Sequence, residues 1–233
     1  MGKTVLITGA GRGLGKALAA EFTQRGDRVV AHARSAEALR EVPHDKALIT
    51  DLSQPESLTK AVDKAHIDTL DAIVHNAGVA AISAVADLSV DQWQDHMNVN
   101  VIAPAELTRL LLPQLRQSRG HVVFVNSGAG LRTGPQWSAY GASKHALRSM
   151  ADALRVEEQA NGVRVTSVYP SHFDTDMQRK VRHAVGSDYD PQRATTPETI
   201  AWYIASFVHA PADGVVNEVR IEPPNPLPIK PRD

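Results

Sequence analysis

The chain alternates short runs of apolar, β-branched residues with longer amphipathic segments along its whole length. The short runs predict strands at residues 4–8, 28–33, 47–50, 72–75, 121–126, 164–169 and 215–221. The longer segments predict helices near 13–25, 35–41, 54–65, 91–115, 139–160 and 197–209. Such repeated alternation is typical of an α/β fold in which about seven parallel strands form a doubly wound sheet with helices on both faces.

Three of the predicted strands are apolar on both faces rather than alternating. They read VLIT at 5–8, AIVH at 72–75 and VVFV at 122–125. A strand with two apolar faces is expected in a parallel sheet that helices cover from both sides.

The last eleven residues differ from the rest of the chain. No linker, repeat or charge block interrupts residues 1–222, so we expect one domain there. The segment 223–233 contains Pro223, Pro224, Pro226, Pro228 and Pro231. This proline content excludes a helix or central strand and predicts an extended tail on this or a neighbouring subunit. Its PxxP spacing leaves a polyproline ligand as the alternative.

Composition excludes several classes of function. A formal net charge of −1 over 233 residues gives no general attraction to nucleic acid or to an anionic membrane. The chain has no cysteine, which excludes disulfides and catalytic thiols, and its ten histidines show no metal-ligand spacing. We therefore expect a cytoplasmic protein with no metal, no nucleic-acid partner and no membrane partner.

A glycine-rich loop, TGAGRGLG at residues 8–15, follows the first predicted strand. The GxGxxG spacing fails because Leu14 stands where its third glycine would be, whereas GxxxGxG fits through Gly9, Gly13 and Gly15. A tight turn from a strand into the start of a helix can hold a pyrophosphate. The position of the loop therefore favours a dinucleotide site over an ordinary turn.

Two arginines indicate which dinucleotide binds. The second predicted strand ends in Arg34 and Ser35 and carries no acid for a ribose 2′-hydroxyl, whereas Arg12 lies in the glycine loop. A guanidinium group matches the geometry of a 2′-phosphate. This arrangement predicts NADP(H), with two solvated surface arginines as the alternative.

Polar residues also follow the third and fourth predicted strands. Asp51, followed by Leu52, could accept a hydrogen bond from an adenine amino group or could cap a helix. Asn76, Ala77 and Gly78 follow the fourth strand, where loops line the cofactor crevice of such sheets.

The sequence YGASK places Tyr140 and Lys144 four residues apart, on one face of a predicted helix. A tyrosine pKa near 10 is too high for a base at neutral pH, and one cation at about 4 Å supplies roughly the energy needed to lower it. Ser127 stands just past a predicted strand, and Asn100 lies on the long helix before that strand. These residues predict acid–base chemistry at the carboxyl edge of the sheet.

Together, these motifs resemble the short-chain dehydrogenase/reductase family in its branch of about 250 residues. The resemblance implies a Rossmann-type fold and a catalytic tetrad of Asn100, Ser127, Tyr140 and Lys144. In that tetrad Tyr140 is the general acid/base, Ser127 orients the substrate oxygen, Lys144 lowers the tyrosine pKa and holds the nicotinamide ribose, and Asn100 supports a water chain. The expected cofactor-binding residues are Gly9, Arg12, Gly13, Leu14, Gly15, Arg34, Ser35, Asp51, Leu52, Asn76, Ala77, Gly78, Tyr140, Lys144, Pro170, Phe173 and Thr175.

The resemblance also implies a homodimer or homotetramer formed through the helices near 91–115 and 139–160. The sequence departs from the family pattern at two positions. His75 replaces the first asparagine of NNAG, and Ser171 replaces the glycine of a Pro-Gly pair.

We therefore predict an NADPH-dependent oxidoreductase that interconverts a small or medium-sized carbonyl compound and its alcohol. The expected substrate pocket contains Leu131, Trp137, His172, Met177, Val181 and Tyr189. A basic group in the same loop, Arg179, Lys180, Arg182 and Arg193, leaves a ketoacyl substrate on a carrier protein as an alternative. A second alternative is an NADP(H)-binding regulatory protein without catalysis.

Overall fold

The computed structural model describes residues 2–171, 173–174, 179 and 189–226. Seven parallel strands form one sheet in the order β3-β2-β1-β4-β5-β6-β7, which confirms the predicted doubly wound α/β fold. The strands are β1 (Thr4–Ile7), β2 (Arg28–Ala33), β3 (Lys46–Ile49), β4 (Ala72–His75), β5 (His121–Val125), β6 (Arg164–Pro170) and β7 (Glu218–Ile221).

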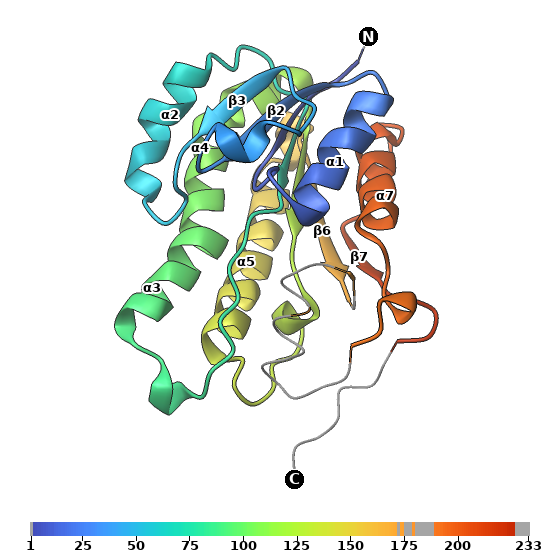
Figure 1. Cartoon of the computed structure of the whole chain (residues 1–233). Helices are drawn as coiled ribbons and strands as arrows, with labels where there is room; N and C mark the ends of the chain where they lie inside the picture. The colour runs from blue at the N-terminus through green and yellow to red at the C-terminus, as the bar shows by residue number, and fades with distance from the viewer. Residues whose placement is uncertain (1, 172, 175–178, 180–188, 227–233) are drawn as a thin grey trace.

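Helices cover both faces of this sheet, as Figure 1 shows. They are α1 (Gly13–Gln24), α2 (Leu58–Ala65), α3 (Val90–Met97), α4 (Ala103–Ser118), α5 (Ser138–Glu157) and α7 (Pro197–His209). Helices α1 and α7 pack on one face, whereas α2, α4 and α5 pack on the other. The side chains of β1, β4 and β5 enter both apolar layers, which explains why these strands are apolar throughout.

Two predicted elements are shorter than expected. The helix predicted at 35–41 is a single 3-10 turn, η1 (Glu37–Leu39), because Leu39 is its only buried residue and Pro43 follows closely. Strand β7 begins at Glu218 rather than at Val215, since Val215 and Val216 are exposed and lie in the preceding loop.

The long helix predicted at 91–115 consists of α3 and α4 joined by a π-helical turn, η4 (Asn98–Ile102). In this turn the Ala103 N–H donates to the carbonyl of Asn98, five residues earlier. Pro104 has no N–H to donate to Asn100, so regular α-helical bonding cannot continue through this point. Single π turns often mark functional positions in helices.

Two glycines end helical segments where the sequence predicts that these segments end. Gly26 follows α1 with φ 81°, and Gly162 ends the 3-10 turn η6 (Gln159–Asn161) beyond α5 with φ 73°, both in the left-handed region. Beyond β7, the first residues of the proline-rich segment are held by Arg193, whose guanidinium donates to Asn225 and to the Pro226 carbonyl. Among the described residues, no helix is long and apolar enough to cross a membrane.

Candidate active site

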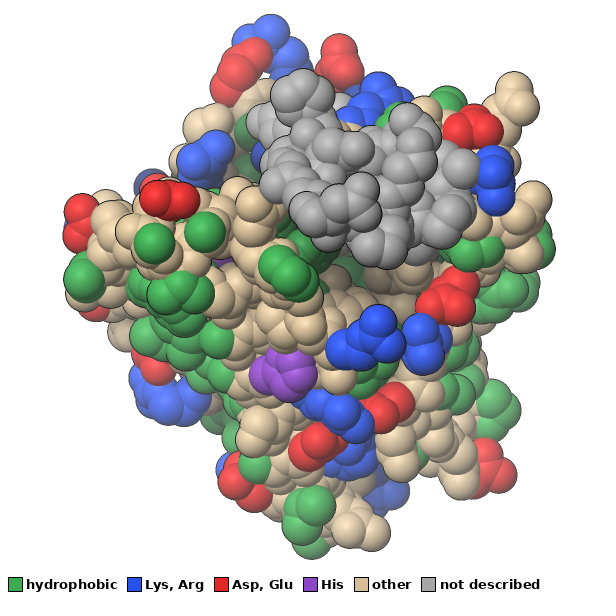
Figure 2. Space-filling model, turned by 90° about the horizontal axis from the view of Figure 1, so that it is seen from below, with side chains coloured by type: hydrophobic (Ala, Val, Ile, Leu, Met, Phe, Trp, Pro, Cys, Tyr) green, Lys and Arg blue, Asp and Glu red, His purple; other side chains and the backbone are tan. Residues whose placement is uncertain are grey.

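A cavity of about 720 Å³ opens at the carboxyl edge of the sheet, where the loops after β1 to β5 meet the start of α5. Figure 2 views the molecule from this end. The predicted site residues that line the cavity are Gly9, Arg12, Gly13, Leu14, Arg34, Ser35, Asp51, Leu52, Asn76, Ala77, Gly78, Ser127, Tyr140, Lys144, Pro170 and Phe173. Gly15 and Asn100 are buried behind its wall, and Thr175 lies outside the described residues.

The glycine loop is tightly folded against the start of α1. Gly9 and Gly13 have φ values of 67° and 51°, in the region that favours glycine. A Cβ on Gly15 would lie 2.1 Å from the Gly9 carbonyl oxygen, so no side chain fits there. The Arg12 side chain does not cap α1, and the first turn of the helix lines the cavity through Gly13 and Leu14.

Thr8 and Asn76 connect this loop to the loop after β4. The Thr8 hydroxyl oxygen accepts hydrogen bonds from the backbone N–H groups of Asn76 and Ala77 at 2.9 and 3.0 Å. The Asn76 amide donates in return to the Thr8 carbonyl at 2.9 Å and to the Gly9 carbonyl at 3.4 Å. The sequence motifs do not predict this function of Thr8, although Thr8 directly precedes Gly9 and its hydroxyl could be expected to bond to a neighbouring loop.

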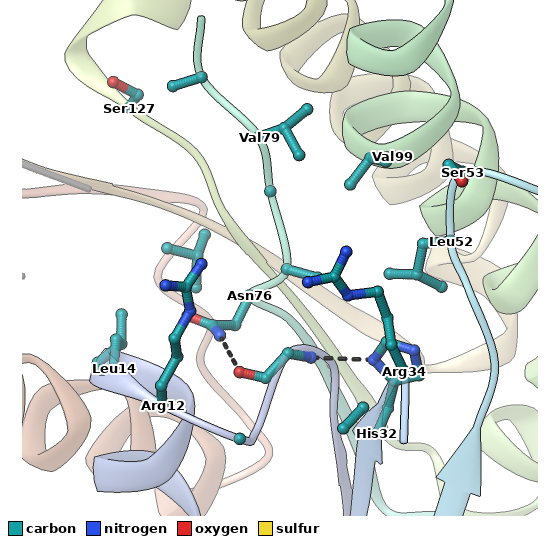
Figure 3. Close-up of a pocket in the computed structure, with 18 of the residues that line it drawn as sticks. Arg12, Leu14, His32, Arg34, Leu52, Ser53, Asn76, Val79, Val99 and Ser127 are labelled. Atoms are coloured by element: carbon teal, nitrogen blue, oxygen red, sulfur yellow. Dashed lines mark hydrogen bonds between the residues drawn. The ribbon is translucent and has the colours of Figure 1, made fainter. Parts of the chain in front are cut away.

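Arg12, in the glycine loop, and Arg34, just after β2, point toward the same cavity (Figure 3). Within the described part of the chain, neither guanidinium group forms an ion pair. Exposed guanidinium groups that line a cavity can bind an anion bidentately. Ser35 also lines this part of the cavity.

Asp51 also lines the cavity, and its carboxylate accepts the Ser53 N–H at 3.0 Å. This hydrogen bond is the largest of the influences that hold the pKa of Asp51 below its ordinary value, and the charge of Arg34 adds to it. Asp51 thus stabilises a turn and also lines the cavity beside Leu52.

The other end of the cavity holds Ser127, Tyr140 and Lys144. Lys144 Nζ lies 5.9 Å from the Tyr140 ring centre and donates a hydrogen bond to the Val125 carbonyl at 3.0 Å. Burial raises the pKa of Tyr140, and a hydrogen bond with Ser127 lowers it. Burial lowers the pKa of Lys144 to about 8. Burial is therefore the largest influence on the pKa of both groups.

Asn100 lies in the π turn and is 1% exposed. Its Oδ1 accepts the Val79 N–H at 2.9 Å, and its Nδ2 donates to the Val79 carbonyl at 3.0 Å and to Ser143 Oγ at 2.9 Å. A Cβ on Gly78 would lie 3.2 Å from Asn100 Oδ1 and 3.7 Å from Lys144 Nζ. Asn100 therefore fixes the loop after β4 close to the Lys144 ammonium group.

The expected substrate pocket is described in part. Trp137 lines the cavity with its ring centre 5.8 Å from that of Tyr140, whereas Leu131 is not among the lining residues. The Tyr189 hydroxyl hydrogen-bonds to Asp174, which also pairs with Arg179 at 2.9 Å. The expected residues outside the described part of the chain are His172, Met177, Lys180, Val181 and Arg182.

Comparison with known proteins identifies the family of this chain. A family model for short chain dehydrogenases matches residues 3–186. The chain belongs to the short-chain dehydrogenase family. It is therefore an oxidoreductase of a family that uses NAD(H) or NADP(H) and acts on small molecules.

Both characterised and uncharacterised short-chain dehydrogenases are similar in sequence to this chain over most of its length. An uncharacterized oxidoreductase of Staphylococcus epidermidis is 30% identical over 230 residues, covering 95% of this chain and 97% of that protein. The benzil reductase ((S)-benzoin forming) of Saccharomyces cerevisiae is 37% identical over 204 residues, covering 80% and 77%. The structure of a metagenomic short-chain oxidoreductase in complex with NADP superposes with a TM-score of 0.79 at 27% identity, covering 95% and 97%.

Both departures from the short-chain dehydrogenase pattern leave the site framework in place. His75 packs in the core, where its Nε2 lies 2.8 Å from Thr108 Oγ1 and its ring stacks on Phe124 with centres 5.0 Å apart. Burial lowers the pKa of His75 to about 3, so this histidine is neutral. The Ser171 N–H donates to the Ile221 carbonyl at 2.9 Å and continues the pairing of β6 with β7.

Proposed function

We propose that the protein is an NADPH-dependent oxidoreductase that interconverts a small carbonyl compound and its alcohol. The observation that carries this proposal is a single cavity with two chemically different ends. One end presents Arg12 and Arg34, and the other presents Ser127 and Tyr140. A phosphate-bearing dinucleotide lying between them would bring its reactive end to the hydroxyl groups.

The residues present fit NADP(H). The tight packing at Gly15 and the left-handed turns at Gly9 and Gly13 leave room for a pyrophosphate at the start of α1. Arg12 and Arg34 have no ion-pair partner among the described residues and suit a 2′-phosphate. The NADP complex of the metagenomic relative supports this choice of dinucleotide.

When bound, NADPH supplies a hydride for the carbonyl carbon. Tyr140 protonates the carbonyl oxygen in reduction and accepts the proton in oxidation, while the Ser127 hydroxyl orients that oxygen. Lys144 favours the phenolate form when charged, and it holds the nicotinamide ribose. Asn100 holds the loop after β4 in place close to Lys144. In the proposed mechanism Asn100 also supports a water chain that carries protons.

The substrate we propose is small to medium in size and largely apolar. Trp137 lines the cavity beside Tyr140, and Phe173 adds a second aromatic side chain to the cavity lining. The yeast relative named for benzil reduction supports an aromatic carbonyl substrate. Two of the four basic residues that favoured a carrier-linked ketoacyl substrate are already engaged, Arg179 by Asp174 and Arg193 by Asn225.

We further propose that residues 1–222 form one cytoplasmic domain that assembles into a homodimer or homotetramer. The proposal follows the family resemblance, which implies assembly through the two long helical segments; Ile102 in η4 and Val156 in α5 are exposed apolar side chains on these segments. Light scattering coupled to gel filtration tests this, and a monomer at micromolar concentration would contradict it.

The decisive experiment is a panel of carbonyl compounds and alcohols, including benzil, followed at the NADPH absorbance with NADH in parallel. We expect the KM for NADPH to be lower than the KM for NADH. Equal or better use of NADH would overturn the cofactor assignment. Flat traces across the panel, together with tight NADPH binding, would favour the regulatory alternative.

A further inference from the structure

The imidazole of His32, a residue of β2, bridges the ends of two neighbouring strands. Its Nδ1 lies 3.0 Å from the backbone nitrogen of Gly9, just after β1. Its Nε2 lies 3.2 Å from the carbonyl oxygen of Thr50, just after β3. Because β2 lies between β1 and β3 in the sheet, one side chain connects the carboxyl ends of all three strands.

These two partners allow only one protonation state of the ring. A backbone N–H can only donate, so Nδ1 must carry no proton, and a carbonyl can only accept, so Nε2 must carry one. His32 is therefore neutral and in its Nε2–H form. Burial acts in the same direction, since it lowers the pKa of His32 to about 4.

The contact with His32 also determines the direction of the Gly9 peptide. His32 accepts the Gly9 N–H on one side, while the Asn76 amide donates to the Gly9 carbonyl at 3.4 Å on the other (Figure 3). A Cβ on Gly9 would lie 3.1 Å from Ala77 Cα, so the backbone of Gly9 packs closely against Ala77. The Gly9 N–H thus points toward His32 at the edge of the sheet.

We propose that His32, through its unprotonated Nδ1, is a positioning residue that holds the first turn of the glycine loop and thereby sets the affinity for the dinucleotide. This inference rests on the proposed dinucleotide binding. A loop without this acceptor has an unsatisfied N–H at its first glycine, and it must reorganise before a pyrophosphate can bind.

The first test uses the wild-type protein. Long-range ¹H–¹⁵N spectra of the imidazole rings distinguish the three forms of a histidine. We expect a neutral Nε2–H ring for His32 at pH 7, unchanged when NADP⁺ is added. A charged ring or an Nδ1–H ring would overturn the proposal.

The second test compares variants by titration with NADP⁺. His32→Leu removes both hydrogen bonds of the ring and should raise the Kd by about tenfold, the effect expected for one unsatisfied backbone donor. His32→Asn places an amide oxygen near the position of Nδ1 and should recover most of that loss. His32→Gln, whose amide lies one bond farther out, should recover less than His32→Asn.

The matched control is His121→Leu. His121 is also buried, and its Nε2 lies 2.7 Å from Thr166 Oγ1, but it stands at the start of β5 and does not line the cavity. Its substitution should lower the melting temperature without changing the Kd. Equal Kd values for His32→Leu and wild type, or equal weakening by His121→Leu, would overturn the proposal. If wild type itself binds no NADP⁺, the proposed function fails instead.

Discussion

The ammonium nitrogen of Lys144 lies 5.9 Å from the ring centre of Tyr140, with both side chains buried. Burial disfavours the charged form of each group, so it lowers the pKa of Lys144 to about 8 and raises that of Tyr140. The charge of Lys144 therefore changes within the range in which the protein can be assayed.

This relationship predicts the pH dependence of carbonyl reduction. Lys144 loses its proton as the pH rises through about 8, and the cation that favours the Tyr140 phenolate is lost with it. We expect kcat/KM to fall above that pH, and Lys144→Met to reduce kcat/KM and abolish the descending limb. A wild-type profile that stays flat to about pH 10 would contradict this assignment.

Removing the Tyr140 hydroxyl should abolish turnover without preventing dinucleotide binding. Proton transfer by a positioned side chain contributes about 10²- to 10⁴-fold, so we expect Tyr140→Phe to lose at least about a hundredfold in kcat. The control is Tyr203→Phe on the outer face of α7, which should behave as wild type. Activity of Tyr140→Phe above about a tenth of wild type is incompatible with the mechanism.

Arg34→Gln should change cofactor preference. A hydrogen bond to a charged group contributes about 1.5–3 kcal/mol, so the KM for NADPH should rise by about tenfold or more while the KM for NADH stays within about threefold. Arg40→Gln is the matched control, because Arg40 follows β2 closely but pairs with Glu37 and does not line the cavity. Equal effects of Arg34→Gln on both cofactors would remove Arg34 from the 2′-phosphate site.

Gly15→Ala should damage the glycine loop. The added Cβ would lie 2.1 Å from the Gly9 carbonyl oxygen, and a backbone atom cannot move aside without distorting the turn. We expect a loss of about 1–3 kcal/mol in the free energy of unfolding and weaker NADP⁺ binding. Gly214→Ala is the control, since a Cβ there meets nothing within 4 Å. Equal stability and binding of the two variants would show that the loop tolerates a side chain.

The buried histidines predict acid sensitivity. Burial lowers the pKa of His121 from 6.5 to about 3, so between these values the unfolded chain binds a proton that the folded chain does not. The free energy of unfolding should therefore fall as the pH falls, by about 1.4 kcal/mol per pH unit for one such group. Urea unfolding of His121→Gln between about pH 6 and 4 should show a smaller slope than wild type. Identical slopes would mean that His121 is protonated in the fold.

Much of this fold can be predicted from local sequence because each strand buries its own apolar run. The segment VVFV becomes β5, and Gly26 and Gly162 end helices where their left-handed backbone is needed. The alternation of strands and helices leads directly to the parallel sheet and to a site at its carboxyl edge.

The features that the sequence did not predict depend on contacts between distant residues. The contact between Gly9 and His32 joins residues 23 positions apart, and neither residue alone indicates it. The π turn at Asn100 requires both the missing donor of Pro104 and the partners of the Asn100 amide. The lowered pKa of Lys144 also depends on the fold, because the sequence does not indicate how completely the side chain is removed from water.

The order of strands in the sheet separates the two ends of the cavity. Arg12 and Arg34 come from the turns after β1 and β2, whereas Ser127 follows β5 and Tyr140 lies on α5, beyond β4. The two groups share no side-chain hydrogen bond among the described residues. Under the proposed function, cofactor choice and carbonyl chemistry are therefore set by separate groups of residues. Exchanging the arginines for an acid would then leave the residues that handle the proton unchanged.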